Sequence, residues 1–234
     1  MGDILVENSY QEGQTLLIDK PLNWTSFDVV SKIRYTLKNH LQVKKIKVGH
    51  AGTLDPLATG LLIICTGKKT KTINEFLTQD KEYIGEIKIG ATTPSHDLET
   101  EIDKEYSLPY IDASVLKIIS KKFTGEIEQI PPLFSAKKIQ GKRAYEYARE
   151  NQQIELKPVV VNIAALNLEL TENNILKFSC KCSKGTYIRA LARDIGVALN
   201  SGAHLIKLRR IRSGNFSIEQ AKSVVEWVDI IKTS

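Results

Sequence analysis

Residues 159–182 read VVVNIAALNLELTENNILKFSCKC. Apolar and polar residues alternate over 159–170 and again over 176–182, and the stretch 171–174 between the two runs is polar. A period of two is typical of a strand with one buried face, and two such runs joined by a polar turn predict an antiparallel hairpin. This stretch decides the fold class, because a doubly wound parallel sheet is not built from hairpins.

Further strands and isolated helices surround this hairpin. The pattern predicts strands over 14–18, 61–65, 81–90 and 205–211, and one more before a turn at Gln140-Gly141. It predicts helices that begin at Thr25 or Ser26, at Asp112, after Gly185 and near Ser217, and a short helix around Tyr145 and Tyr147. Hairpins between isolated helices indicate an α+β fold, with a mixed, largely antiparallel central sheet flanked by helices.

Length and composition favour one soluble domain. The chain has 234 residues, of which 42% are hydrophobic, and no repeat or Gly/Ser linker divides it, so we expect a single domain over 1–234. No run approaches the ~18 apolar residues of a membrane helix, and we expect a cytoplasmic protein without a membrane partner. Cys65, Cys180 and Cys182 lack the spacing of a disulfide framework or a zinc site. The last two either pack together or face opposite sides of a sheet.

The charge of the chain favours a polyanionic partner. The formal net charge is +6, and the cations come in separate clusters. These clusters are 44–47, 68–71, 137–143 and 207–212. Several loops could therefore neutralise phosphates on one folded RNA, although any single cluster is also what a solvated helix or hairpin face looks like.

The stretch GHAGTLDPLATG, residues 49–60, is the strongest functional signal. Its glycines permit close backbone approach, and Asp55 stands between Leu54 and Pro56 in a loop that leads to a buried strand. An isolated Asp-Pro pair would simply indicate a turn. The whole stretch, however, resembles the catalytic loop of the TruB family of bacterial tRNA pseudouridine-55 synthases, in which the matching aspartate is the nucleophile.

Other motifs in the same order extend this resemblance along almost the whole chain. They are Lys20-Pro21, Lys81-Glu82-Tyr83, the run 129–132, Ser135-Ala136, the run 141–149, the run 182–189 and the run 202–210. The resemblance implies a pseudouridine synthase fold and an isomerase that needs no cofactor and no metal. It also implies that Asp55, Tyr83 and Arg189 are catalytic.

The chemistry requires an ionised carboxylate at Asp55, which stabilises or traps positive charge at the sugar or removes a sugar proton. Because burial raises the pKa of a carboxyl group, a cation should stand nearby, and Arg189 is the matching residue in the family. We therefore predict a bidentate Arg189–Asp55 pair. Tyr83 would stack on the uracil and assist removal of its C5 proton.

Five residues are expected to bind the flipped-out nucleotide: Lys20, His50, Asp97, Tyr187 and Leu208. His50 would fill the gap that the base leaves, and Lys20 would support the Asp55 loop or contact RNA. Asp97 is carried over from the family although the segment around it, 91–97, departs from the more acidic family pattern. Each of these residues also has an ordinary structural reading, since inward tyrosines and leucines on strands usually pack in the core.

A second departure lies at the C-terminus, where many family members continue into a small RNA-binding PUA domain that we do not expect here. The expected partner is the T-arm of tRNA, and the expected state is a monomer. Three alternatives stay open: a noncatalytic RNA-binding or tRNA-folding protein, a synthase acting on other RNA, and a sugar-cleaving hydrolase. The hydrolase is disfavoured because only one acid sits in a clear motif, whereas such enzymes use two.

Overall fold

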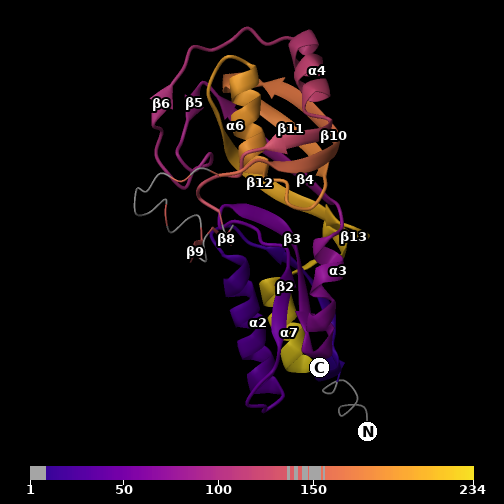
Figure 1. Cartoon of the computed structure of the whole chain (residues 1–234). Coiled ribbons are helices and arrows are strands. Elements are labelled where there is room, and N and C mark those ends of the chain that lie inside the picture. The colour runs from indigo at the N-terminus through magenta and orange to yellow at the C-terminus, as the bar shows by residue number, and fades with distance from the viewer. Residues whose placement is uncertain (1–8, 136–137, 140–141, 144–146, 148–153, 155) are drawn as a thin grey trace. The chain divides into compact units, whose positions relative to one another are not determined.

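The computed structural model describes residues 9–135, 138–139, 142–143, 147, 154 and 156–234. The chain forms two compact units (Figure 1). Unit 1 comprises Met1–Tyr83 and Leu208–Ser234, and unit 2 comprises Ile84–Lys207. The boundary falls inside two strands, β4 (Lys81–Ile89) and β12 (Ala203–Ser213).

Unit 1 is built on strands that pair in the order β14-β1-β3-β12, with β2 beside β3 and β13 beside β12. Their bounds are β1 (Thr15–Lys20), β2 (Val48–Ala51), β3 (Ala58–Thr66), β13 (Phe216–Ser217) and β14 (Lys222–Ser223). The β1–β3, β2–β3 and β12–β13 pairs are antiparallel, whereas β1–β14 and β3–β12 are parallel. The sheet is therefore mixed and mostly antiparallel.

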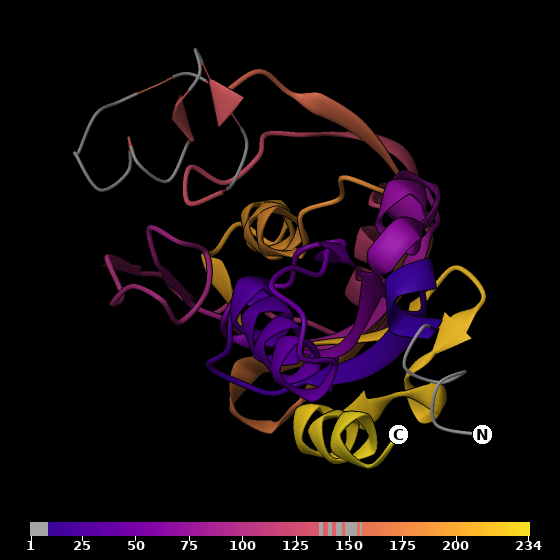
Figure 2. The same cartoon turned by 90° about the horizontal axis from the view of Figure 1, so that it is seen from below.

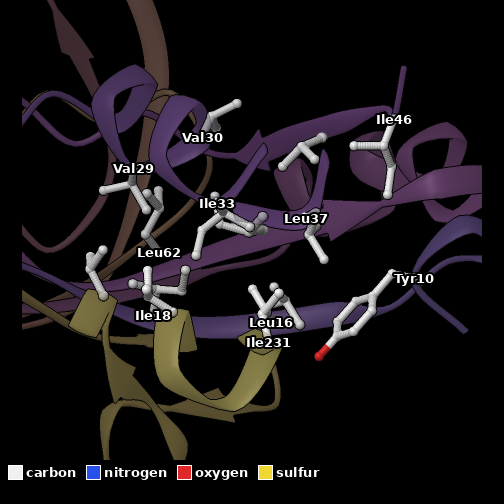
Figure 3. Packing of buried hydrophobic residues seen from close by; sticks show 14 residues of the cluster. Tyr10, Leu16, Ile18, Val29, Val30, Ile33, Leu37, Ile46, Leu62 and Ile231 are labelled. Atoms are coloured by element: carbon white, nitrogen blue, oxygen red, sulfur yellow. The ribbon is translucent and has the colours of Figure 1, made fainter. Parts of the chain in front are cut away.

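The helices of unit 1 cover this sheet. They are α2 (Ser26–His40), α3 (Ile73–Leu77), α7 (Val224–Thr233) and the 3-10 helices η1 (Gly67–Thr72) and η3 (Ile218–Gln220). Helix α7 packs beside α2 (Figure 2). Between them and the sheet lies an apolar core, in which Ile33 and Leu37 of α2 lie toward Leu16 and Ile18 of β1 (Figure 3). Each such buried side chain stabilises the fold by about 1.5–3 kcal/mol relative to exposure.

Unit 2 contains strands that pair in the order β4-β11-β10-β7. Its further elements are β5 (Ala91–Thr92), β6 (Lys104–Glu105), α4 (Ala113–Lys122), β7 (Gly125–Gln129), β8 (Lys138–Ile139), β9 (Lys142–Arg143), β10 (Val159–Thr171), η2 (Glu172–Asn174), β11 (Ile175–Cys182) and α6 (Ile188–Ala198). The β10–β11 and β7–β10 pairs are antiparallel, and α4 packs on β10. No helix in the described part of the chain is long and apolar enough to cross a membrane.

The α+β prediction is confirmed, and the hairpin over 159–182 forms as expected, with η2 in place of a plain turn. Thr25 is the cap of α2 and Asp112 the cap of α4. Cys180 and Cys182 are both buried on one face of β11, so the alternative of opposite faces is wrong. The strands β2, β7, β13 and β14 were not predicted, and β2 occupies the start of the stretch that was expected to be a loop. The predicted turn at Gln140-Gly141 and most of the short helix around Tyr145 and Tyr147 lie outside the described residues.

The predicted last helix is present, but it begins at Val224 and not near Ser217, so the predicted start is wrong. Ser217 caps only the short helix η3, with Gln220 completing the capping box. Ser223 then caps α7 through an equivalent box with Glu226. Between the two, Lys222 and Ser223 pair with β1 as β14, and this pairing interrupts the helix. Two similar capping boxes six residues apart made the first one look like the start of α7.

Candidate functional site

The Asp55 loop is fastened to the N-terminal end of α2. The hydroxyl of Ser26, at the first position of the helix, donates to the carbonyl of Leu54 at 3.1 Å and accepts from its backbone N–H at 2.8 Å. The backbone N–H of Asn23 donates to the carbonyl of Pro56 at 2.9 Å. Both neighbours of Asp55 are thus held, while the Asp55 side chain itself remains partly exposed. The backbone that carries the Asp55 carboxylate is therefore fixed, while the carboxylate itself is accessible to a reactant.

Lys20 places a buried ammonium group next to Asp55. The lysine is 0% exposed, and its Nζ donates to the carbonyl oxygens of Pro21, Trp24 and Pro56, the last at 3.4 Å. Burial lowers the pKa of Lys20 to about 8, and the attraction of Asp55 works against that shift. The structure therefore supplies a cation within electrostatic range of the Asp55 carboxylate. Within unit 1 these two predicted site residues are brought together.

A second buried cation, Arg210, supports the same loop. Its Nε donates to the carbonyl of Leu61 at 2.7 Å and an Nη to that of Gly52 at 3.1 Å, and it is 1% exposed. Gly60 has a φ of +103°, and a side chain there would clash with the Arg210 backbone. The glycine at this position is needed both for its backbone conformation and for close strand packing.

His50 lies on β2, directly before the Asp55 loop. Burial and the charge of Arg210 lower the pKa of His50, which favours the neutral ring. Its Nδ1 is buried and makes no hydrogen bond among the residues that the structure describes. The ring as a whole is partly exposed, and a neutral, partly exposed ring is suited to contact a base.

Leu208 and Tyr83 occupy strand positions in unit 1. Leu208 is paired with Ala58, three residues after Asp55, and is partly buried. Tyr83 is also partly exposed, so it is not a fully buried core residue. Two residues earlier, the buried Lys81 donates to the carbonyls of Phe76, Leu77 and Gln79, which fixes the start of β4.

In unit 2, Arg189 is buried and pairs with Asp97. Its Nε lies 3.6 Å from Oδ2 of Asp97, and both side chains are less than a tenth exposed. The guanidinium also donates to the carbonyl of Ser95 at 3.2 Å and to that of Phe134 at 2.8 Å. A solvated cation at the start of a helix, the ordinary alternative for Arg189, is therefore wrong. Arg189 and Asp97 are brought together.

Gln129 holds the backbone of Tyr187. Its side-chain amide donates to the Tyr187 carbonyl at 3.2 Å, and its oxygen accepts from the Tyr187 N–H at 3.0 Å. Tyr187 is thereby fixed immediately before α6, two residues from Arg189, with its side chain partly exposed. Sequence reasoning placed Gln129 in a motif but gave it no role.

His96 is a further residue that sequence reasoning passed over. It has a φ of +60° between Ser95 and Asp97, and its Nδ1 is buried and makes no hydrogen bond in the described part of the chain. Burial, Arg193 and Arg189 lower the pKa of His96 to about 4, so it is neutral at physiological pH. Ser26 and Arg210 were also missed, because each acts through contacts with residues far away in the sequence.

Within unit 1 the hydrogen bonds around Leu54 and Pro56 position the Asp55 carboxylate, and within unit 2 Arg189 is a buried cation beside Asp97. Within the described residues, no group of three or more His, Cys, Asp or Glu side chains gathers as metal ligands would. In unit 1, the held Asp55 loop suits chemistry in which one carboxylate acts on a bound substrate.

Comparison with known proteins gives concordant matches along the chain. Residues 38–188 match the TruB family pseudouridylate synthase N-terminal domain, and residues 189–233 match the tRNA pseudouridylate synthase B C-terminal domain. The chain is 56% identical over 226 residues to tRNA pseudouridine synthase B of Phocaeicola vulgatus, which covers 94% of this chain and 95% of that protein. The protein of the same name from Parabacteroides distasonis is 54% identical over 220 residues, covering 94% of both chains. A chain in a crystal structure of a Cbf5-Nop10-Gar1 complex matches with a TM-score of 0.71 and 28% identity, over 96% of this chain and 56% of that one.

Proposed function

Because the chain belongs to the TruB family of pseudouridine synthases, which are isomerases, we propose that it converts uridine 55 in the T-loop of tRNA to pseudouridine. The catalytic carboxylate in this proposal is that of Asp55. The observation that carries it is the anchored Asp55 loop, whose Leu54 and Pro56 are hydrogen-bonded on either side while a buried ammonium group, that of Lys20, lies next to the acid. The names of the similar proteins support tRNA as the substrate.

The proposed reaction rearranges one nucleotide without adding or removing atoms overall. The bond between N1 of uracil and C1′ of ribose breaks, the base turns, and a bond forms between C5 and C1′. The proton on C5 is then lost, and N1 gains one. Asp55 assists by trapping or stabilising positive charge at the sugar, or by removing a sugar proton, and in each case it must be ionised.

The other predicted site residues act around this step in the proposal. Arg189 pairs with Asp55 and keeps it charged, and Tyr83 stacks on the uracil and assists loss of the C5 proton. Asp97, bound to Arg189, orients the guanidinium.

The remaining predicted residues surround the nucleotide. Tyr187 and Leu208 line the pocket, His50 braces the RNA where the base has left the stack, and Lys20 supports the Asp55 loop. The T-arm as target, a single catalytic domain formed by the whole chain, a monomeric state and a cytoplasmic location are further parts of the proposal.

Unmodified tRNA transcripts carrying tritium at C5 of every uridine test the substrate. The wild-type protein should release one tritium per tRNA, and a transcript with cytidine in place of uridine 55 should release none. RNA binding without release would favour a noncatalytic binding protein and would contradict the proposal. Release from ribosomal RNA fragments but not from tRNA would favour a synthase with another RNA substrate.

A further inference from the structure

A basic pocket in unit 1 lies apart from the groups assigned to catalysis. Its cavity volume is about 590 Å³, and it is lined by Arg34, Lys45, Ile46, Lys47, Val48 and Thr70. We propose that this pocket binds backbone phosphates of the RNA outside the loop that carries the target uridine. The inference rests on the proposed function in one respect, namely that the polyanion is RNA.

The fold assembles the pocket from two basic clusters that are separate in the sequence. Val48 is paired with Thr66 at the end of the β2–β3 hairpin, and the N–H of Gly67 donates to the carbonyl of Lys47 at 2.8 Å. These contacts bring the lysines of 44–47 next to the run 68–71. Helix α2 adds a third source of charge, because an Nη of Arg34 donates to the carbonyl of Val48 at 2.9 Å.

The cations of the pocket are available to an anion. Lys45 and Lys47 are exposed, and among the described residues neither forms an ion pair with a carboxylate. None of the six lining residues is acidic. Glu12 pairs at 2.7 Å with Lys68, which does not line the pocket.

The groups that line the pocket suit a phosphate diester. The guanidinium of Arg34 is held by its bond to Val48 and lies 5.9 Å from the ring of Phe27, so its position is fixed before a ligand binds. Arginine presents a planar fork of donors to phosphate, and the two lysines add mobile point charges. The two apolar side chains that line the pocket, Ile46 and Val48, offer no hydrogen-bonding groups that would read a base, which favours backbone contact without sequence preference.

The distance along the hairpin places the pocket away from the target nucleotide. Strand β3 runs from Ala58, next to the Asp55 loop, to Thr66, next to the pocket. Eight residue steps at about 3.3 Å each give a separation of up to roughly 26 Å. Phosphates on one strand of duplex DNA are spaced by about 3.4 Å of axis, and the spacing in A-form RNA is of the same order, so the pocket would contact RNA several nucleotides from the flipped uridine.

The test compares the affinities of two RNAs for the variant Lys45→Gln/Lys47→Gln. The probes are a full-length tRNA transcript and a minimal hairpin that carries the target loop on a short stem. We expect the variant to bind the full-length tRNA on the order of tenfold more weakly at low salt. The slope of log affinity against log salt should fall by about 0.7–0.9 for each phosphate that the variant no longer neutralises. The affinity for the minimal hairpin should change less than about twofold.

The matched control is Lys117→Gln/Lys121→Gln, which removes two exposed charges from α4. It should bind both RNAs like the wild type, and circular dichroism should show all proteins folded. Adding Arg34→Gln to the first variant should weaken tRNA binding further.

If the variant Lys45→Gln/Lys47→Gln bound full-length tRNA with the affinity and the salt dependence of the wild type, the inference would be overturned. Equal losses on both RNAs would overturn the placement outside the target loop. Because the readout is binding, these outcomes differ from failure of the proposed function, which would appear as absence of tritium release by the wild type.

Discussion

Arg189 combines three interactions that one planar group can make at once. It donates to the carbonyls of Ser95 and Phe134, which belong to segments far apart in the sequence, and it lies beside Asp97. A buried guanidinium in such a setting is a positioned group rather than a mobile charge, because these contacts fix its plane, and a guanidinium has more N–H donors than these contacts use. These simultaneous contacts require a planar group with several donors, which explains why an arginine and not a lysine stands here.

Replacement of Arg189 by Lys tests this assignment. One ammonium cannot reproduce the fork, so we expect pseudouridine formation to fall about 100-fold and the free energy of unfolding to fall by about 1–3 kcal/mol. Tritium release and urea denaturation measure the two effects. The control is Arg193→Lys, whose partly exposed arginine pairs with Asp194 and should cost less than about 1 kcal/mol. A fully active Arg189→Lys variant would rule out the proposed role.

The buried Lys20 predicts a particular dependence of stability on pH. Its pKa is about 8 in the folded protein against 10.5 for an ordinary lysine, so above pH 8 the unfolded chain binds more protons at this site than the folded one. The contribution of Lys20 to the free energy of unfolding should therefore rise from about pH 8 to about pH 10.5, by at most about 1.4 kcal/mol per pH unit.

Urea denaturation of wild type and Lys20→Met between pH 7 and pH 10.5 isolates this contribution, because all other titrating groups are shared. The variant should show the smaller gain in stability as the pH rises. Parallel curves for the two proteins would mean that the folded-state pKa of Lys20 is not depressed.

At the scale of elements, the N-terminal end of α2 links secondary structure to the site. Thr25 caps the helix through a capping box with Asp28, which is a local contact. The next residue, Ser26, instead makes two hydrogen bonds to Leu54, 28 residues away. The hydroxyl of Thr25 thus stabilises the helix, whereas the hydroxyl of Ser26 fixes the Asp55 loop.

The variants Thr25→Ala and Ser26→Ala separate helix capping from anchoring of the Asp55 loop. Thr25→Ala should lower the free energy of unfolding by about 1 kcal/mol and leave activity within about twofold of wild type. Ser26→Ala leaves buried polar groups of Leu54 without their partner, so we expect a loss of about 1–3 kcal/mol and an activity on the order of tenfold lower. Thermal melts measure the loss of stability of each variant, and tritium release measures its activity. Equal activity of the two variants would disprove the role of Ser26 in holding the loop.

Elements defined by local patterns could be predicted from the sequence. The alternation over 159–182 specified the β10–β11 hairpin, and Thr25 and Asp112 marked helix starts through their capping side chains. The start of α7 was misplaced because β14 forms through pairing with β1, a partner some 200 residues earlier. The short strand β7 was missed for a similar reason, since its stability comes from β10.

At the scale of the whole molecule, the residue types of the site were predictable and most of their contacts were not. The motifs singled out Asp55, Arg189 and Tyr83 through their resemblance to the TruB family. The contact of Lys20 with the Asp55 loop was one of the two roles predicted for that lysine. Two further contacts depend on residues brought together only by folding: Arg189 with Asp97, and Arg210 with Gly52. The predicted Arg189–Asp55 pair stays a prediction. No local pattern joins the basic clusters around 45 and 70 into one pocket, because only the pairing of β2 with β3 brings them together.

Replacement of Asp55 by Asn shows whether the reaction depends on an ionised carboxylate, because the variant keeps the size of the side chain and removes its charge. Under single-turnover conditions with tRNA tritiated at C5, we predict a rate of tritium release at least about 10⁴-fold below that of the wild type, since the reaction depends on the ionised carboxylate. Binding of tRNA and the melting temperature should be close to wild type. A folded Asp55→Asn protein that releases tritium within tenfold of the wild-type rate would contradict the account.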